Sequence, residues 1–296
     1  MGSVLFLSVR GTATNGNGLA QPSRRKSGQK LLRPEALAMS RFNNLEFNSD
    51  SEGQAPVEQP LAKGEAHYLA EARVAFESAN FERGLRLYSK VLEFNPENAT
   101  AWSGQVRMLI ELGEFREAKL WADKALERFP HEAELLAAKA VALGREGDLQ
   151  GALAFSDASI EERGGTAYIW LARGDVLMAR KETRADYCFE KALLLAPRDW
   201  FTAWLAARIR YYYEQFALAL KLLQQAMEWN AAHFVLWLEL GRCQRAVGLI
   251  SLAKHSFLQA QQLNPDCHQV GEALDSLSNA GFGSRVLGWW HRLLSR

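Results

Sequence analysis

A bulky residue recurs at an almost constant interval along most of this chain, and no other feature restricts its fold as strongly. The interval is 34 residues, with a last step of 33, through Tyr68, Trp102, Leu136, Trp170, Trp204 and Trp237. A period in this range is typical of proteins that stack copies of one supersecondary unit, because a single unit cannot bury its own apolar face. We therefore expect the tryptophans of the series to be structural anchors.

Two further series share this period. About sixteen residues after each bulky residue comes a small one: Gly84, Ala118, Ala152, Ala185, Ala219 and Ala253. Twelve residues later follows a helix breaker or its replacement: Pro96, Pro130, Gly164, Pro197, Ala231 and Pro265. A small residue lets two helices approach closely, and proline ends a helix because it has no N–H donor. Each unit is therefore predicted to contain two packed helices.

Glycines mark the predicted turn between the two helices of a unit. Gly113, Gly147 and Gly248 lie where the first helix must end, and glycine adopts the left-handed conformation that such an ending needs. The fourth and fifth units have Lys181 and Gln215 at this place. Gly164 and Gly165 stand where proline would end the third unit. We expect these three joints to be looser, or to curve differently, than is usual for such repeats.

This combined pattern resembles the tetratricopeptide-repeat family, whose 34-residue unit reads W…LG…Y…A…F…A…P. One well-matched stretch contains Trp237, Leu240, Gly241, Gly248, Ala253, Phe257, Ala260 and Pro265. Another contains Trp102, Leu109, Gly113, Phe115, Ala118, Ala125 and Pro130. The resemblance covers residues 65–265 and implies an all-α fold, a right-handed α-solenoid of about six 34-residue helix-turn-helix repeats with a C-terminal capping helix.

The texture of the sequence divides the chain into five segments. They are a disordered leader (residues 1–60), the repeat solenoid (61–265), a capping helix (266–278), a linker (279–284) and an amphipathic Trp-rich tail helix (285–296). The leader is rich in Gly, Ser, Asn, Gln and Pro and has no sustained period. Met39 is a second candidate start within it.

Composition argues against several function classes. The 35 basic and 34 acidic residues nearly cancel, so the basic excess of a nucleic-acid-binding protein is missing. Cys188, Cys243 and Cys267 form no CxxC pair and the six histidines are scattered, so we expect neither a metal nor a cofactor. The sequence has no GxSxG, HExxH or glycine-rich phosphate loop, so we predict a non-catalytic protein. Unpaired cysteines and the lack of a long apolar run favour the cytoplasm.

The resemblance implies that a protein or peptide segment binds in a concave groove lined by the first helix of each unit. Transferred one by one, the family's groove positions include Arg73, Arg107, Arg145, Asp175, Tyr212, Tyr213, Arg242 and Arg245. The arginines favour an acidic or C-terminal carboxylate ligand, since guanidinium makes paired hydrogen bonds to carboxylates. The alternative is that arginine simply suits a wet helix surface. The two tyrosines either bind the ligand or pack between repeats, whereas Tyr211 is expected in the core.

One subclass of the family binds the acidic C-termini of chaperones through lysine and asparagine side chains. Here the corresponding positions hold Leu69, Arg73, Gly104, Glu134 and Ala138. We therefore do not expect a chaperone-tail carboxylate clamp in this chain.

The tail predicted at 285–296 has apolar residues at helical spacing beside arginine. Its candidate interaction residues are Trp289, Trp290, Arg292, Leu293 and Leu294. Such a helix suits a membrane interface or a hydrophobic groove, and three destinations stay open: the chain's own solenoid, another protein and a bilayer surface. A peripheral membrane adaptor attached through this tail is thus the alternative to a groove-binding scaffold.

Overall fold

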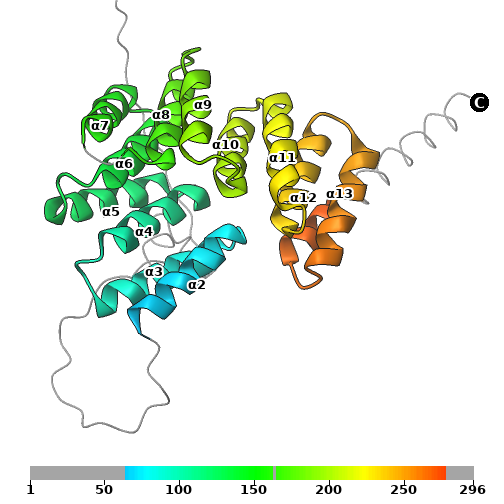
Figure 1. Ribbon diagram of the computed structural model, residues 1–296, viewed down its shortest axis with the longest axis horizontal. Coiled ribbons are helices and arrows are strands. Elements are labelled where there is room, and N and C mark those ends of the chain that lie inside the picture. The colour runs from blue at the N-terminus through cyan, green and yellow to red at the C-terminus, as the bar shows by residue number, and fades with distance from the viewer. Residues whose placement is uncertain (1–63, 163–164, 278–296) are drawn as a thin grey trace, which may run out of the picture. The chain divides into compact units, whose positions relative to one another are not determined.

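The computed structural model describes residues 64–162 and 165–277, in which all regular structure is helical (Figure 1). The helices of this part form six hairpins, which we number as repeats 1 to 6: α2 (Glu65–Glu77) with α3 (Phe81–Phe94), α4 (Ala99–Leu112) with α5 (Phe115–Arg128), α6 (Ala133–Glu146) with α7 (Leu149–Glu161), α8 (Ala167–Ala179) with α9 (Ala185–Leu195), α10 (Trp200–Tyr212) with α11 (Phe216–Asn230), and α12 (Phe234–Ala246) with α13 (Ile250–Leu263). The predicted all-α repeat fold is confirmed. Met39 and the predicted leader, linker and tail lie outside the described residues.

The small residues of the second series are buried, as their spacing predicts. Ala118, Ala152, Ala219 and Ala253 are each 0% exposed. Ala152 of α7, for example, belongs to one apolar cluster with residues of α6 and α8. A larger side chain at this position would push the helices apart, because a close-packed interior has no room for added methylenes.

All six hairpins turn at a residue with positive φ. The six residues, with their φ values, are Ala79 (53°), Gly113 (81°), Gly147 (104°), Lys181 (59°), Glu214 (60°) and Gly248 (83°). In every turn the next amide donates a hydrogen bond of 2.8–2.9 Å to the carbonyl five residues earlier, which is the bond that closes a Schellman ending. The joints of repeats 4 and 5, expected to be looser, thus have the same turn as the others. In repeat 5 the left-handed residue is Glu214, one residue before the predicted Gln215.

Glycine at the two exposed left-handed positions is expected to stabilise the protein. Lys181→Gly and Glu214→Gly should each raise the free energy of unfolding by about 0.5–1 kcal/mol, because only a side chain with a Cβ is strained at this φ. Gly113→Ala is the matched control, because a Cβ there would meet no atom within 4 Å and only backbone strain is added. Its free energy of unfolding should fall by a similar amount. Urea unfolding of the three variants measures this, and a destabilised Lys181→Gly would contradict it.

Residues 268–277 form a further helix after repeat 6. Val270, Ala273 and Leu277 lie in one buried cluster with Phe257 and Ala260 of α13. The apolar side of the last repeat is therefore covered in the way that a capping helix covers it.

The joint between repeats 4 and 5 departs from the regular pattern. Of all helices that follow one another in the stack, α9 and α10 contact each other least. At this joint Arg198 has a φ of 59°, the only positive φ among the described residues that connect one repeat to the next. In repeat 2 the indole Nε1 of Trp102 donates a hydrogen bond of 2.8 Å to the carbonyl of the residue six positions earlier, and Trp237 does the same in repeat 6. The buried Nε1 of Trp204 has no hydrogen-bond partner among the described residues.

Candidate functional site

The first helices of the repeats form a shared inner face with two hollows. The N-terminal hollow, of about 790 Å³, has walls from α2, α4, α6 and the start of α10; among its lining residues are Leu69, Arg73, Ser103, Arg107, Glu134 and Phe201. The C-terminal hollow, of about 630 Å³, is bounded by α4, α6, α10 and α12; among its lining residues are Phe115, Arg145, Tyr212, Phe216, Arg242 and Arg245. A third space on this face, beside Asp175, measures only about 20 Å³. Six of the eight predicted groove residues are thus divided between the two large hollows, whereas Asp175 lines only the small space and Tyr213 lines none of the three.

The two predicted arginines of the N-terminal hollow already have partners. Arg107 lies over the ring of Tyr168, with its Cζ 3.8 Å from the ring centroid, and its Nη1 is 3.9 Å from Oε2 of Glu134. Burial raises the pKa of Tyr168 far above its usual value, so this ring stays neutral. Arg73 donates through Nε to Glu77 at 2.7 Å. A ligand carboxylate would therefore compete with the chain's own groups for these guanidiniums.

Arg145 and Asp175 form the most deeply buried ion pair of this face. Their side chains are 8% and 3% exposed, and Arg145 Nη2 lies 2.6 Å from Asp175 Oδ2. Tyr213 donates its hydroxyl to Oδ1 of the same carboxylate at 2.8 Å, and the guanidinium lies 4.0 Å from the ring centroid of Tyr212. Burial and the neighbouring carboxylate raise the pKa of Tyr213 above its usual range, so it acts only as a neutral donor. These contacts join repeats 3, 4 and 5.

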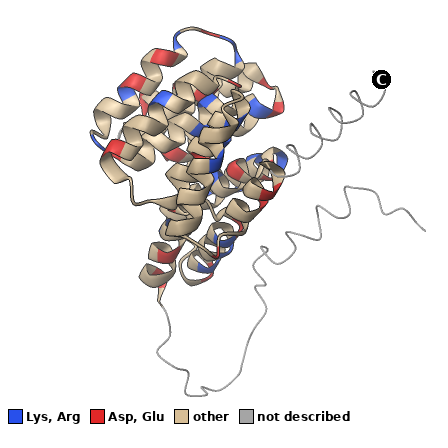
Figure 2. Cartoon of the chain, turned by 90° about the vertical axis from the view of Figure 1, so that its right-hand side faces the viewer, with Lys and Arg blue, Asp and Glu red and all other residues tan. Residues whose placement is uncertain are grey.

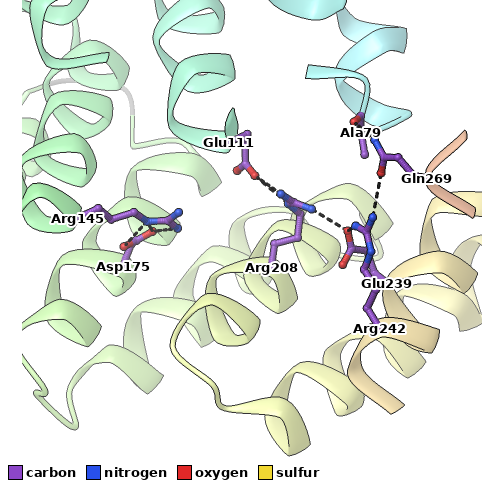
Figure 3. Close-up of polar contacts among 8 residues, drawn as sticks. All are labelled: Ala79, Glu111, Arg145, Asp175, Arg208, Glu239, Arg242 and Gln269. Atoms are coloured by element: carbon purple, nitrogen blue, oxygen red, sulfur yellow. Dashed lines mark hydrogen bonds and ion pairs between the residues drawn. The ribbon is translucent and has the colours of Figure 1, made fainter. Parts of the chain in front are cut away.

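A second polar network, not predicted from the sequence, surrounds Arg208 of α10 (Figure 3). Its Nη2 lies 2.6 Å from Oε2 of Glu111 on α4, and its Nη1 lies 2.7 Å from Oε1 of Glu239 on α12. Glu239 also accepts from Nη1 of Arg242 at 2.9 Å, and Arg242 in turn donates to Gln269 at 3.1 Å. Burial alone would lower the pKa of Arg208, but the carboxylates of Glu111 and Glu239 outweigh it and raise that pKa.

The repeat alignment contains a signal that could have revealed this network. Arg208 stands four residues after the bulky residue of repeat 5, where the other repeats have small or β-branched residues: Ala72, Val106, Ala140, Gly174 and Gly241. Glu239 stands two residues after the bulky residue of repeat 6, where the other repeats have only small ones: Ala70, Gly104, Ala138, Ala172 and Ala206. Arg208 and Glu239 are thus opposite charges at repeat positions that are otherwise uncharged, which indicates that the two residues pair with each other.

The C-terminal hollow combines aromatic rings with one arginine that lacks an acidic partner. Arg245 donates through Nη1 to the hydroxyl of Ser276 at 2.6 Å, and among the described residues no carboxylate lies within ion-pair distance of it. Tyr212 is 45% exposed. Tyr211, expected in the core, is only half-buried; it lines this hollow and packs edge-on against Phe216, with ring centroids 5.2 Å apart. The hollow therefore offers apolar rings close to an available cation.

The described residues give no sign of a metal centre. Among them, no group of three or more His, Cys, Asp or Glu side chains is placed to hold an ion. The thiols of Cys188 and Cys243 are buried, and burial raises the pKa of Cys243 to about 12. None of the described helices is both long and apolar enough to cross a membrane. Figure 2 shows acidic and basic residues scattered over the same helices.

The predicted tail site lies outside the described residues. It comprises Trp289, Trp290, Arg292, Leu293 and Leu294. The solenoid, another protein and a bilayer surface therefore remain the three predicted binding partners of this tail.

Comparison with known proteins supports the repeat assignment. Residues 75–142 match the sequence model of the tetratricopeptide repeat, and the search of curated proteins found no match to this chain. Among solved structures, the chain is similar to a tetratricopeptide repeat protein from Parabacteroides merdae, with 17% identity over 75% of this chain and 87% of that chain and a TM-score of 0.48.

Two further structures show the same remote similarity. The APC/C hetero-tetramer Cut9-Hcn1 matches with 16% identity and a TM-score of 0.43 over 76% of this chain; the match covers 51% of that chain, so this chain aligns with about half of its length. YrrB, a TPR protein with an unusual peptide-binding site, matches with 17% identity and a TM-score of 0.37, over 63% of this chain and 96% of that chain. Residues 75–142 match the tetratricopeptide-repeat model, and the six hairpins with their period of about 34 residues support the same repeat type along the described chain.

Proposed function

We propose that this protein is a non-catalytic scaffold that binds a protein or peptide segment through the inner face of its repeats. The observation that carries the proposal is the C-terminal hollow, where aromatic rings surround a cleft of about 630 Å³. Ligand sites are typically concave and mostly apolar, with a few convergent polar groups. Tyrosine and arginine are also the residues most enriched at binding hot spots.

The charges around the hollow favour a segment that carries one carboxylate beside an apolar or aromatic side chain. Arg145, Arg208 and Arg242 already bind carboxylates of the chain itself. Arg245, with only a hydroxyl partner, is free to form a charge-assisted hydrogen bond to an acidic side chain or a C-terminal carboxylate. Tyr212 lies on the same face and offers exposed apolar area for the neighbouring ligand side chain.

Selection from a random peptide display library on the full-length protein tests this proposal. We expect the enriched peptides to carry Asp, Glu or a free C-terminus next to an aromatic or aliphatic residue. Arg245→Glu should weaken the binding of such a fluorescent peptide at least about tenfold, the effect of losing one charge-assisted hydrogen bond. Arg116→Glu, at an 83% exposed site on α5, is the charge-matched control and should change the affinity less than about twofold.

Two results would contradict the proposal. Failure to enrich any peptide would remove the basis for groove binding. Enriched peptides that bind equally well to Arg245→Glu would show that the C-terminal hollow is not the site.

A further inference from the structure

The first helix of repeat 5 contacts repeats 1 and 2, which are far from it in the sequence. The ring of Phe201 on α10 packs edge-on against Phe76 of α2, with ring centroids 5.0 Å apart, and the ring of Trp204 lies 6.4 Å from Phe76. Arg208 binds Glu111 of α4 through Nε at 2.8 Å and Nη2 at 2.6 Å (Figure 3). We call these residues, Phe76, Glu111, Phe201, Trp204 and Arg208, the return contact.

Long side chains make the return contact, and helix backbones contribute little to it. The close backbone neighbours of α10 are α8, α9, α11 and α12, and neither α2 nor α4 is among them. Helices packed through small residues are held together along their length, as at Ala152. The return contact is made by three aromatic rings and by Arg208, whose Cζ also lies 4.8 Å from the ring centroid of Phe81. Gln269 adds a hydrogen bond of 3.3 Å from its Nε2 to the carbonyl of Ala79. Because these are contacts between side chains, or between one side chain and one carbonyl, they can separate without unpacking a repeat.

The joint next to the return contact is the irregular one between repeats 4 and 5. There α9 and α10 contact each other little, Arg198 has a strained left-handed conformation and the indole Nε1 of Trp204 has no partner among the described residues. Hinges absorb conformational change at a few residues at the ends of elements. Residues 196–199, between α9 and α10, have these properties.

We propose that α10 is an internal occupant of the inner face of repeats 1 and 2, and that repeats 5 and 6 turn away about residues 196–199 to free that face. Phe201 lies in the wall of the N-terminal hollow, and Arg208 lies in the wall of the C-terminal hollow. Release of the return contact would therefore expose inner-face surface that α10 covers. This proposal concerns the chain's own contacts and does not rest on the proposed peptide binding.

The charges around Arg208 suit a contact that opens and closes. A buried cation that loses its only partner is strongly destabilised. Arg208, however, keeps Glu239 of the adjacent repeat 6 at 2.7 Å when it leaves Glu111. Glu111 itself is 15% exposed and regains water on opening. Opening therefore leaves no unpaired buried charge.

Hydrogen–deuterium exchange of full-length variants tests the proposal. Glu111→Gln removes the charge that faces Arg208, and Phe201→Ala removes the aromatic contact. Each is expected to speed amide exchange in α2 and α10 roughly tenfold, the effect of losing one hydrogen bond to a charged group or one buried aromatic contact. Exchange in α6 and α7 should stay unchanged. Small-angle scattering of the combined variant should show a larger radius of gyration.

A matched control separates opening from a general loss of stability. Glu97→Gln breaks an ion pair with Arg128 that is 2.7 Å long and joins neighbouring segments of the stack; it should leave exchange in α10 unchanged. Unchanged exchange and scattering in both test variants would overturn the proposal. Faster exchange in all repeats would overturn it as well, because the return contact would then be part of one cooperative core.

Discussion

Replacing Arg145 with alanine is expected to lower the free energy of unfolding by about 3–5 kcal/mol, the usual cost of leaving one member of a buried ion pair without its partner. Asp175 is only 3% exposed, and in this variant the hydroxyl of Tyr213 would be its remaining side-chain partner. One hydroxyl does not replace a guanidinium that lies within hydrogen-bond distance of both carboxylate oxygens. Chemical denaturation of the purified variant measures the loss.

The double variant tests whether the unpaired charge causes this loss. Arg145→Ala with Asp175→Ala removes more atoms than Arg145→Ala alone, yet it should be the more stable of the two, because no buried charge is left. If the two single effects instead add, packing rather than charge accounts for the cost. The interpretation of this pair as a structural joint would then need revision.

Replacing Trp204 with alanine is the second change with a large expected effect, a loss of about 3–5 kcal/mol. Its side chain is 0% exposed and packs against the rings of Phe76 and Phe201, so truncation leaves a large cavity at the centre of the contacts of α10. Trp237→Ala, at the same position of repeat 6, should cost less because Trp237 is only partly buried. Thermal or chemical unfolding of the two variants gives the comparison.

A conservative substitution refines the second prediction. Trp204→Phe should cost much less than Trp204→Ala, because it keeps an aromatic ring and removes an indole N–H that has no partner among the described residues. Trp102→Phe, in contrast, breaks the 2.8 Å bond to the carbonyl of Pro96. If Trp204→Phe proves the more harmful of the two, the unpartnered N–H does not describe the protein in solution.

Local features of the fold could be predicted from the sequence, because one hairpin is specified by residues within 34 positions of each other. The bulky and small series located the helix contacts, and Gly113, Gly147 and Gly248 located three of the turns. The other three turns were not predicted to be left-handed, because Ala79, Lys181 and Glu214 are residue types that do not favour a positive φ.

The candidate site was harder to predict, because the partner of an inner-face side chain depends on geometry that accumulates over repeats. Arg145 and Asp175 lie 30 residues apart, in adjacent repeats, so the aligned repeats place them near each other. Glu111 and Arg208 lie 97 residues apart. Their contact depends on the sum of three successive rotations between repeats, and no residue pattern states those angles. The arginines were therefore predicted as groove residues, but the sequence could not pair them with the carboxylates that bind them.

The contact between Glu111 and Arg208 also limits how the repeat number of this protein can change. Repeat proteins are often treated as modular, because each unit contacts only its neighbours and a unit can be gained or lost at small cost. Here the addition or deletion of one unit between repeats 2 and 5 would carry Arg208 away from Glu111, and Phe201 away from Phe76. The number of described repeats between Glu111 and Arg208 is thus fixed by this contact, and an engineered chain that keeps the contact must keep that number.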